Sequence, residues 1–224
     1  MRNNVKQKKM EHKLLLRAAD HSSYPNSALL TSYMEESAAR HHHLCPRQVL
    51  GIRMGLYGLR MMGLIDAQYE PRFHNDRKHL LTVVETDGCG ADGVAVATGC
   101  YVGRRTLRVV DFGKMAATLV HTRTGAAVRV VPRPDARSLA RTCAPDARSR
   151  WHAYLRAYQI IPDDLLLAAR EVTLTQSIAE ILSKPSARVI CGHCGEEILN
   201  EREIRQNDQL LCRSCAGAAY YREL

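Results

Sequence analysis

The sequence has no hydrophobic run that approaches the roughly 20 apolar residues needed to cross a membrane. Its first twenty residues are basic and contain only the short run LLL at 14–16, which is too short for a signal-peptide core. It also has no internal repeat, and 224 residues are enough for one main domain and a small appendage. We therefore expect a cytoplasmic protein that does not associate with membranes.

The eight cysteines are the next informative feature. They would suffice for four disulfides, but disulfides persist only in an oxidising compartment. Because the sequence has no export signal and contains two CxxC pairs, metal ligation or thiol chemistry is the better expectation.

The formal net charge of +9 raises the question of an anionic partner. Much of it lies between Arg123 and Arg156, where eight arginines stand against two aspartates. The same stretch is rich in turn-forming residues, which is typical of a solvated surface. The charge is thus either an arginine-rich surface or a site for an anionic substrate, cofactor or nucleic acid.

The hydrophobic pattern changes twice along the chain. Helical spacing covers 27–43 and resumes at Pro46, which suits a first helical turn because its missing N–H is no loss there. Leu50, Met54, Tyr57 and Met61 then form a stripe that we expect in the core. Glycines at 51, 55 and 58 weaken this helix by about 1 kcal/mol each, unless they allow close packing against a neighbour. Strands are predicted over 79–86, 93–103, 107–113, 116–122 and 126–132, and later helices over 149–159 and 162–183.

This order of elements predicts an α+β fold, with a largely antiparallel sheet packed with helices and a small C-terminal zinc-finger module. We place a basic N-terminal tail at 1–26, the α+β domain at 27–184 and the zinc-finger module at 185–224.

The C-terminal cysteines give the most specific signal. Two CxxC pairs lie seventeen residues apart, a spacing typical of a structural zinc site. Four thiolates complete a tetrahedron and leave no position for a substrate, so this zinc is expected to fold the module. A redox dithiol pair or an iron site is the alternative. The ligands are Cys191, Cys194, Cys212 and Cys215.

The finger is an unpromising nucleic-acid binder. Five acidic residues and three arginines lie between its outer cysteines. Because phosphate neutralisation dominates affinity for nucleic acids, we expect it to contact protein instead.

A second cluster occupies residues 41–45. In an extended segment His41, His43 and Cys45 would point to one side. Cys45 is predicted to be the N-cap of the helix that begins at Pro46, where the helix dipole and free N–H groups favour a thiolate. The cluster is therefore a transition-metal site, an activated nucleophile or a polar surface.

Other candidate residues lie in the predicted sheet. Cys89 is flanked by glycines, with Asp92 close behind, and is predicted to lie in a turn between two strands, a common place for a ligand or nucleophile. Lys114 lies near another strand end. Cys100 is either part of this site or a buried apolar side chain, whereas Cys143 is expected to be buried.

Five motifs follow one another in a specific order: HxHLCP at 41–46, DGCGADG at 87–93, TGC at 98–100, DFGK at 111–114 and the four-cysteine finger. As a set spanning about residues 30–215 they resemble the FmdE family of formylmethanofuran dehydrogenase proteins, and the finger alone also resembles the DksA/TraR type. The family's first motif carries a phenylalanine and a glycine where this chain has Arg40 and Arg47. An arginine on each flank suits an anionic ligand.

The resemblance implies a cleft lined by the histidine–cysteine segment and the Cys89 loop, a zinc-bound C-terminal module and a homodimer. The family name comes from a molybdenum or tungsten enzyme operon, so an oxidoreductase partner protein is also implied.

Three functions remain open. In the first, His43, Cys45 and Cys89 bind a second transition metal in the cleft with His41 assisting. Cys45 and Cys89 then serve as reactive thiols, and Asp92 or Lys114 does acid–base or orienting work.

The second function is a non-catalytic accessory subunit whose finger docks onto an oxidoreductase. The third is a zinc-finger regulator of nucleic acid, which the acidic finger and the missing helix-turn-helix signature disfavour. Whether the protein is an enzyme is left open.

Overall fold

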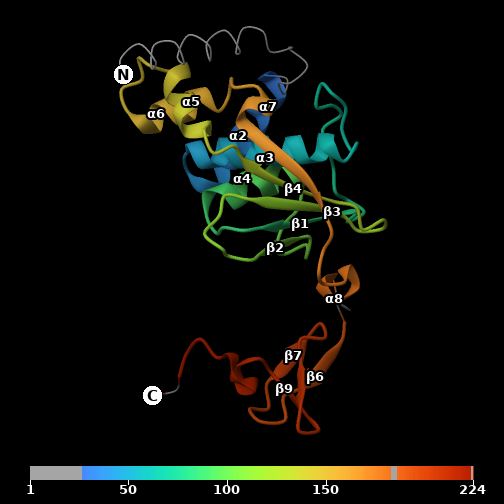
Figure 1. Ribbon diagram of the computed structural model, residues 1–224. Coiled ribbons are helices and arrows are strands. Elements are labelled where there is room, and N and C mark those ends of the chain that lie inside the picture. The colour runs from blue at the N-terminus through green and yellow to red at the C-terminus, as the bar shows by residue number, and fades with distance from the viewer. Residues whose placement is uncertain (1–26, 183–185, 223) are drawn as a thin grey trace. The chain divides into compact units, whose positions relative to one another are not determined.

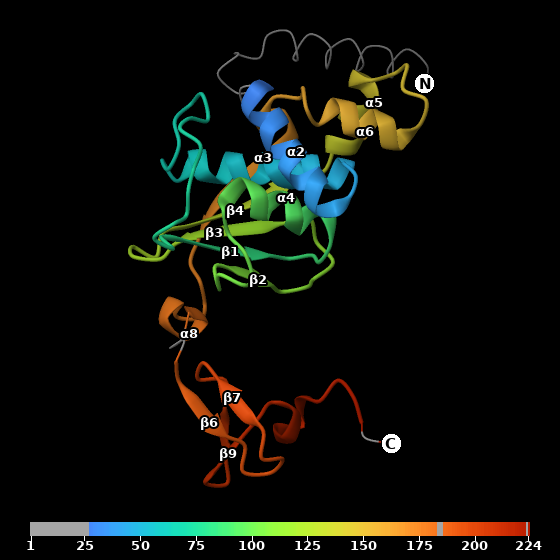
Figure 2. The same ribbon diagram turned by 180° about the vertical axis from the view of Figure 1, so that it is seen from behind.

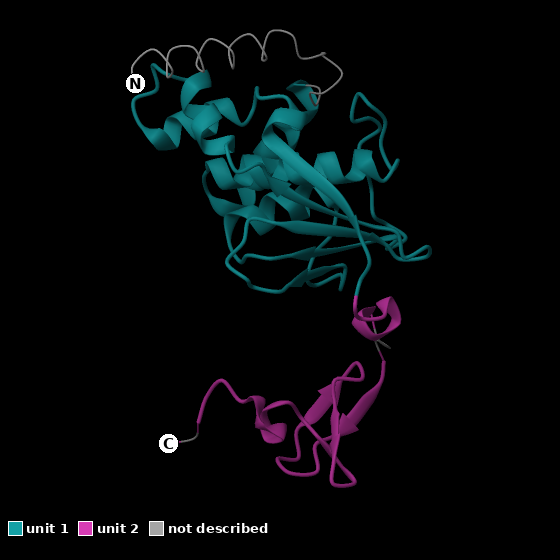
Figure 3. Ribbon diagram, viewed as in Figure 1, with its two compact units in different colours: residues 1–174 teal, residues 175–224 magenta. Residues whose placement is uncertain are grey.

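The computed structural model describes residues 27–182, 186–222 and 224, so the basic tail expected over 1–26 lies outside the described residues. The chain divides into two compact units, residues 1–174 and 175–224 (Figure 3). The division predicted from the sequence lies after residue 184. Within the described ranges, no helix is both long and apolar enough to span a membrane.

The larger unit is a mixed sheet covered by helices (Figure 1). Its helices are α2 (Ser27–His41), α3 (Pro46–Met61), α4 (Cys89–Thr98), α5 (Ala136–Cys143), α6 (Arg150–Ala157) and α7 (Asp163–Leu166). Its strands are β1 (Leu80–Val84), β2 (Leu107–Val109), β3 (Ala117–His121), β4 (Ala127–Pro132) and β5 (Leu167–Val172).

The strand order is β2-β1-β3-β4-β5, with β1 and β2 parallel and the other three pairings antiparallel. The view from behind shows α2, α3 and α4 together on one face of this sheet (Figure 2). The predicted α+β class and largely antiparallel sheet are therefore confirmed.

Two secondary-structure predictions are wrong. Residues 93–103, predicted as a strand, belong mainly to α4, eight of whose ten residues are buried. An apolar run buried on all sides loses the periodicity that separates helix from strand, and its alanines favour helix. Residues 162–183, predicted as one helix, contain the short α7, the strand β5 and α8 (Ile178–Leu182). Six residue pairs along β4 hold β5 in the sheet, so tertiary pairing overrides local helical preference.

The close packing allowed by the glycines of α3 is confirmed. A Cβ atom added at Gly51 would meet the carbonyl oxygen of Gly90 at 2.3 Å, and one added at Gly93 would meet that of Gln48 at 2.2 Å. Helices α3 and α4 thus cross at backbone contact, which only glycine permits at these positions.

The smaller unit begins with α8 and contains two short hairpins. These are formed by β6 (Arg188–Ile190) with β7 (Glu197–Leu199), and by β8 (Ile204–Gln206) with β9 (Gln209–Leu211). A short π-helical turn, η2 (Ser214–Ala218), follows them. Its small core is built around Cys191, Ile198 and Leu211.

Candidate functional site

Cys45 is held in place at the start of α3. It is the N-cap residue, as predicted from Pro46, and its side chain is buried. Its backbone N–H donates to Gln48 Oε1 at 2.7 Å, and Gln48 Nε2 donates to the carbonyl and hydroxyl oxygens of Ser37 at 3.0 Å. Because Gln48 is fully buried, these bonds fix the start of α3 against α2.

Cys89 is the first residue of α4, not a turn residue between strands as predicted. The glycine contact between α3 and α4 brings the starts of both helices to the same cleft, which Cys45 and Cys89 both line. Burial raises the pKa of the Cys89 thiol, and the neighbouring Cys45 thiol raises it further.

His41 is the histidine that contacts Cys89. Its Nε2 atom lies 3.2 Å from Cys89 Sγ and 4.0 Å from Asp92 Oδ2. His43 is exposed, and its ring packs edge-on against that of His41 with centroids 4.7 Å apart. Residues 41–45 do not form one extended segment that would align His41, His43 and Cys45, because His41 ends α2 and His42 adopts a left-handed φ of 62°.

The other two cysteines of this unit lie elsewhere. Cys100 is buried and accepts hydrogen bonds from Asn75 Nδ2 and Thr82 Oγ1, both at 3.3 Å. It is therefore a core residue and not part of the candidate site. Cys143 is half-buried, and burial raises the pKa of its thiol to about 11. Lys114 is exposed and lines the cleft.

The cleft beside the two thiols has a volume of about 1020 Å³. Its walls come from the starts of α3 and α4, the residues before β3, strand β4 and helices α5 and α6. The basic and aromatic side chains that line it are Arg47, Lys114, Arg129, Arg133, Arg137, Trp151, Tyr154 and Tyr158. Three of the eight arginines in the arginine-rich stretch, Arg129, Arg133 and Arg137, thus line one wall of this cleft, which sequence reasoning did not locate.

The buried side chain of Arg53 connects the end of α6, which lines the cleft, to the core. Its guanidinium donates to Asp163 Oδ1 at 2.8 Å and to the carbonyl oxygens of Tyr158 and Ile161 at 2.7 and 2.6 Å. Both side chains of the ion pair are fully buried. Since Arg53 lies on α3, the bonds tie the end of α6 to the helix that Cys45 caps. No sequence pattern indicated this contact, because its partners lie more than 100 positions apart.

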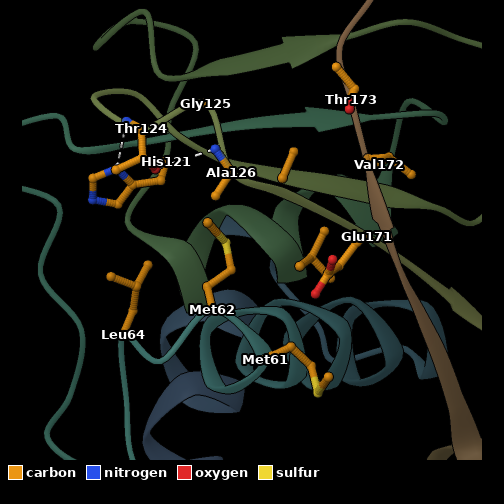
Figure 4. A pocket seen from close by; sticks show the side chains of 12 residues that line it. Met61, Met62, Leu64, His121, Thr124, Gly125, Ala126, Glu171, Val172 and Thr173 are labelled. Carbon is orange, nitrogen blue, oxygen red and sulfur yellow. Dashed lines mark hydrogen bonds between the residues drawn. The ribbon is translucent and has the colours of Figure 1, made fainter.

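A second pocket, of about 870 Å³, lies at the other end of α3 (Figure 4). Met61, Met62 and Leu64 form one side, and the β3–β4 hairpin and the end of β5 form the other. Met61 is 51% exposed there, so the expectation that it lies in the core is wrong. This pocket contains none of the predicted site residues, and we assign the candidate site to the thiol cleft.

The smaller unit brings its four predicted ligands together. The sulfur atoms of Cys191, Cys194, Cys212 and Cys215 all lie within 4.8 Å of one another. Backbone N–H groups, chiefly those of Cys194 and Cys212, lower the pKa of the Cys191 thiol to about 6, which favours the thiolate that metals bind. Gly195, directly after the first pair, has a φ of 75°, which fits the tight knuckle. This geometry can hold a metal ion.

Comparison with known proteins decides the family. Residues 40–185 match the family model described as FmdE, molybdenum formylmethanofuran dehydrogenase operon. The chain belongs to the FmdE family. The matched span begins at Arg40 and includes His41, Cys45, Cys89 and Lys114, whereas the four finger cysteines lie beyond it.

Two relatives of this FmdE protein are informative. It is similar to a tungsten formylmethanofuran dehydrogenase FmdE-like protein from Syntrophus aciditrophicus, with a TM-score of 0.58 and 22% identity over 88% of this chain and 98% of that one. This likeness supports the fold. It is also 35% identical over 101 residues to a protein of Archaeoglobus fulgidus described as a probable S-adenosyl-L-methionine-binding protein. That match covers 45% of this chain and only 26% of the relative.

Proposed function

We propose that this FmdE protein binds two metal ions per chain, a structural zinc in the finger and a second transition metal in the cleft. His41, Cys45 and Cys89 would hold the second ion. The observation that carries the proposal is the 3.2 Å approach of His41 Nε2 to Cys89 Sγ beside a second buried thiol.

The donor set fits such an ion. Zinc–sulfur and zinc–nitrogen bonds of about 2.3 and 2.0 Å at a tetrahedral angle place the two ligand atoms about 3.5 Å apart, close to the separation of His41 and Cys89. Two thiolates and an imidazole suit zinc, iron or another borderline metal. His41 presents Nε2 to Cys89, whereas its Nδ1 atom is buried and, among the residues that the structure describes, has no hydrogen-bond partner, so Nε2 is the ring nitrogen that would bind the ion.

The possible ligands of the cleft are less closely gathered than the four cysteines of the finger. Across the described ranges, the finger cysteines are the one group of three or more ligands whose atoms all lie within 4.8 Å. A cleft ion would therefore draw Cys45, or His43 in its place, toward His41 and Cys89. Three protein ligands leave a fourth position open, which is the arrangement of catalytic rather than structural zinc sites.

The surrounding residues have roles in this proposal. A metal in such a site supplies Lewis acidity or an activated water. Asp92, 4.0 Å from His41 Nε2, would orient a bound ligand or exchange protons with it. Lys114, at the cleft wall, would supply a positive charge or a proton.

Metal content per chain, measured by elemental mass spectrometry, tests the proposal. Wild type is expected to hold two ions, Cys89→Ser one, and the control Cys143→Ser two, because Cys143 does not line the cleft. One ion in the wild type and in both variants would refute the cleft site and leave the finger.

A second candidate function is an accessory subunit of a molybdenum- or tungsten-dependent oxidoreductase. The finger exposes apolar side chains, with Ile190 60% and Leu199 44% exposed, which suits protein contact. In this case one metal per chain is expected, and light scattering should report the mass of a homodimer for the protein alone. A monomer mass would remove the homodimer from the proposal.

A further inference from the structure

Helix α6 presents an aromatic face to the thiol cleft. Trp151, Tyr154 and Tyr158 are spaced three and four residues apart, which places them on one side of the helix, and all three line the cleft. The rings of Tyr154 and Tyr158 are nearly parallel, with an interplanar angle of 9° and centroids 5.8 Å apart. Trp151 is 43% exposed and Tyr154 is half-buried, whereas Tyr158 is buried behind Tyr154, so Trp151 and Tyr154 provide the accessible ring surface. Flat aromatic surfaces of this kind bind planar rings by stacking.

The remaining walls of the cleft carry positive charge. Arg47 starts α3, Lys114 precedes β3, and Arg133 and Arg137 lie at the junction of β4 and α5. One acidic side chain, Asp87, lines the same cleft. Cations from three separate segments therefore converge on one volume.

Not all of these charges are available to a ligand. Arg129 is held by Glu85 through two bonds, Nε to Oε1 at 2.6 Å and Nη2 to Oε2 at 2.7 Å, so its charge is offset. Arg133 lies 3.9 Å from Asp135. For Arg47 and Arg137 the described part of the chain provides no ion-pair partner. Their guanidinium groups can therefore bind an anion with two parallel bonds.

The N-termini of two helices add to the positive charge around the cleft. Helices α3 and α4, of 16 and 10 residues, both begin at the cleft. The positive end of each helix dipole favours an anion there. The cleft volume is at the upper end of the range for small-molecule and cofactor sites.

We propose that the thiol cleft binds a mononucleotide-type ligand, with a planar ring against the aromatic face of α6 and an anionic group at Arg47 and Arg137. The inference deepens the proposed function, because it names the ligand class that would lie beside the cleft metal. Its recognition energy comes from the aromatic and guanidinium groups and not from the metal.

The only tryptophan of the chain, Trp151, makes the cleft directly observable. Titration of the full-length protein with AMP, followed by tryptophan emission, is expected to give a saturable change. Adenosine, which lacks the anion, is expected to bind about tenfold more weakly, since charge-assisted bonds to the phosphate are lost. Ribose 5-phosphate, which lacks the ring, is expected to bind more weakly than AMP as well.

Matched arginine variants locate the anion. Arg137→Gln and Arg47→Gln are each expected to weaken AMP binding several-fold while leaving adenosine binding unchanged. Arg123→Gln, at an exposed arginine on the β3–β4 hairpin outside the cleft, serves as the control and should bind AMP as wild type does. Unchanged far-UV circular dichroism of each variant verifies that it is folded.

Three results would overturn the inference: no saturable change with AMP or CMP through the millimolar range, equal binding of AMP and adenosine, or an equal loss in Arg123→Gln and Arg137→Gln. Repeating the AMP titration with Cys89→Ser distinguishes a failure of this inference from a failure of the metal proposal. If that protein and the wild type hold the same number of metal ions while AMP still binds, the metal proposal fails and this inference stands. If the wild type holds two metal ions but does not bind AMP, this inference fails and the metal proposal stands.

Discussion

The crossing of α3 and α4 is so close that one methyl group at Gly51 is expected to destabilise the larger unit. The Cβ of Gly51→Ala would lie 2.3 Å from the Gly90 carbonyl oxygen and 3.1 Å from the Val94 amide nitrogen. Both are backbone atoms, so neither can rotate away. The two helices would have to separate by about 1 Å to reach ordinary contact.

The size of the effect follows from two opposing terms. Alanine is a better helix former than glycine by about 1 kcal/mol, which stabilises α3. Overpacking against rigid neighbours costs about 1–3 kcal/mol, and contact with backbone alone argues for the upper end. We therefore expect a net loss of about 2 kcal/mol, or about 4–8 °C in Tm for a unit of this size.

Urea unfolding followed by Trp151 emission measures this loss in the larger unit, which contains the only tryptophan. Gly103→Ala is the matched control, because a Cβ there meets nothing within 4 Å and needs no left-handed backbone. It is expected to be neutral or slightly stabilising. If Gly51→Ala proves as stable as Gly103→Ala, the helix crossing is looser than described and the positioning of the two thiols by glycine contact is refuted.

Three further predictions concern other parts of the chain. Replacing Arg53 with Met leaves Asp163 buried without its cation and should cost about 3–5 kcal/mol in denaturant unfolding, whereas a double replacement with Leu at Asp163 should recover much of the loss. Arg129 lowers the pKa of Glu85, chiefly by hydrogen bonding, so the pair stabilises the fold above the ordinary carboxyl pKa and loses this effect as pH falls through the lowered value. Arg129→Gln should thus cost about 1–2 kcal/mol at neutral pH and progressively less in acid, and a pH-independent loss would contradict this. Cys212→Ser should remove one metal ion per chain and unfold the smaller unit by near-UV circular dichroism and proteolysis, leaving the Trp151 unfolding transition unchanged.

Local chemistry was enough to predict several parts of this protein. The spacing of the two CxxC pairs predicted the four-cysteine site, because ligands in two short knuckles need few distant contacts to meet. Pro46 predicted the start of α3 and the N-cap position of Cys45, because proline suits only the first helical turn. The glycines of α3 indicated close packing, although not the partner helix.

Contacts between distant segments decided the rest. Residues 93–98 became helix because they are buried on every side beneath α3, and residues 167–172 became a strand because β4 offered an unpaired edge. The histidine that meets Cys89 is His41 rather than His43, because α2 ends there and the chain turns through a left-handed residue. Residue types and their spacing determined which side chains were available for chemistry. Packing among α3, α4, β4, α5 and α6 decided that the thiols, arginines and aromatic rings share one cleft, since those contacts join residues far apart in the sequence.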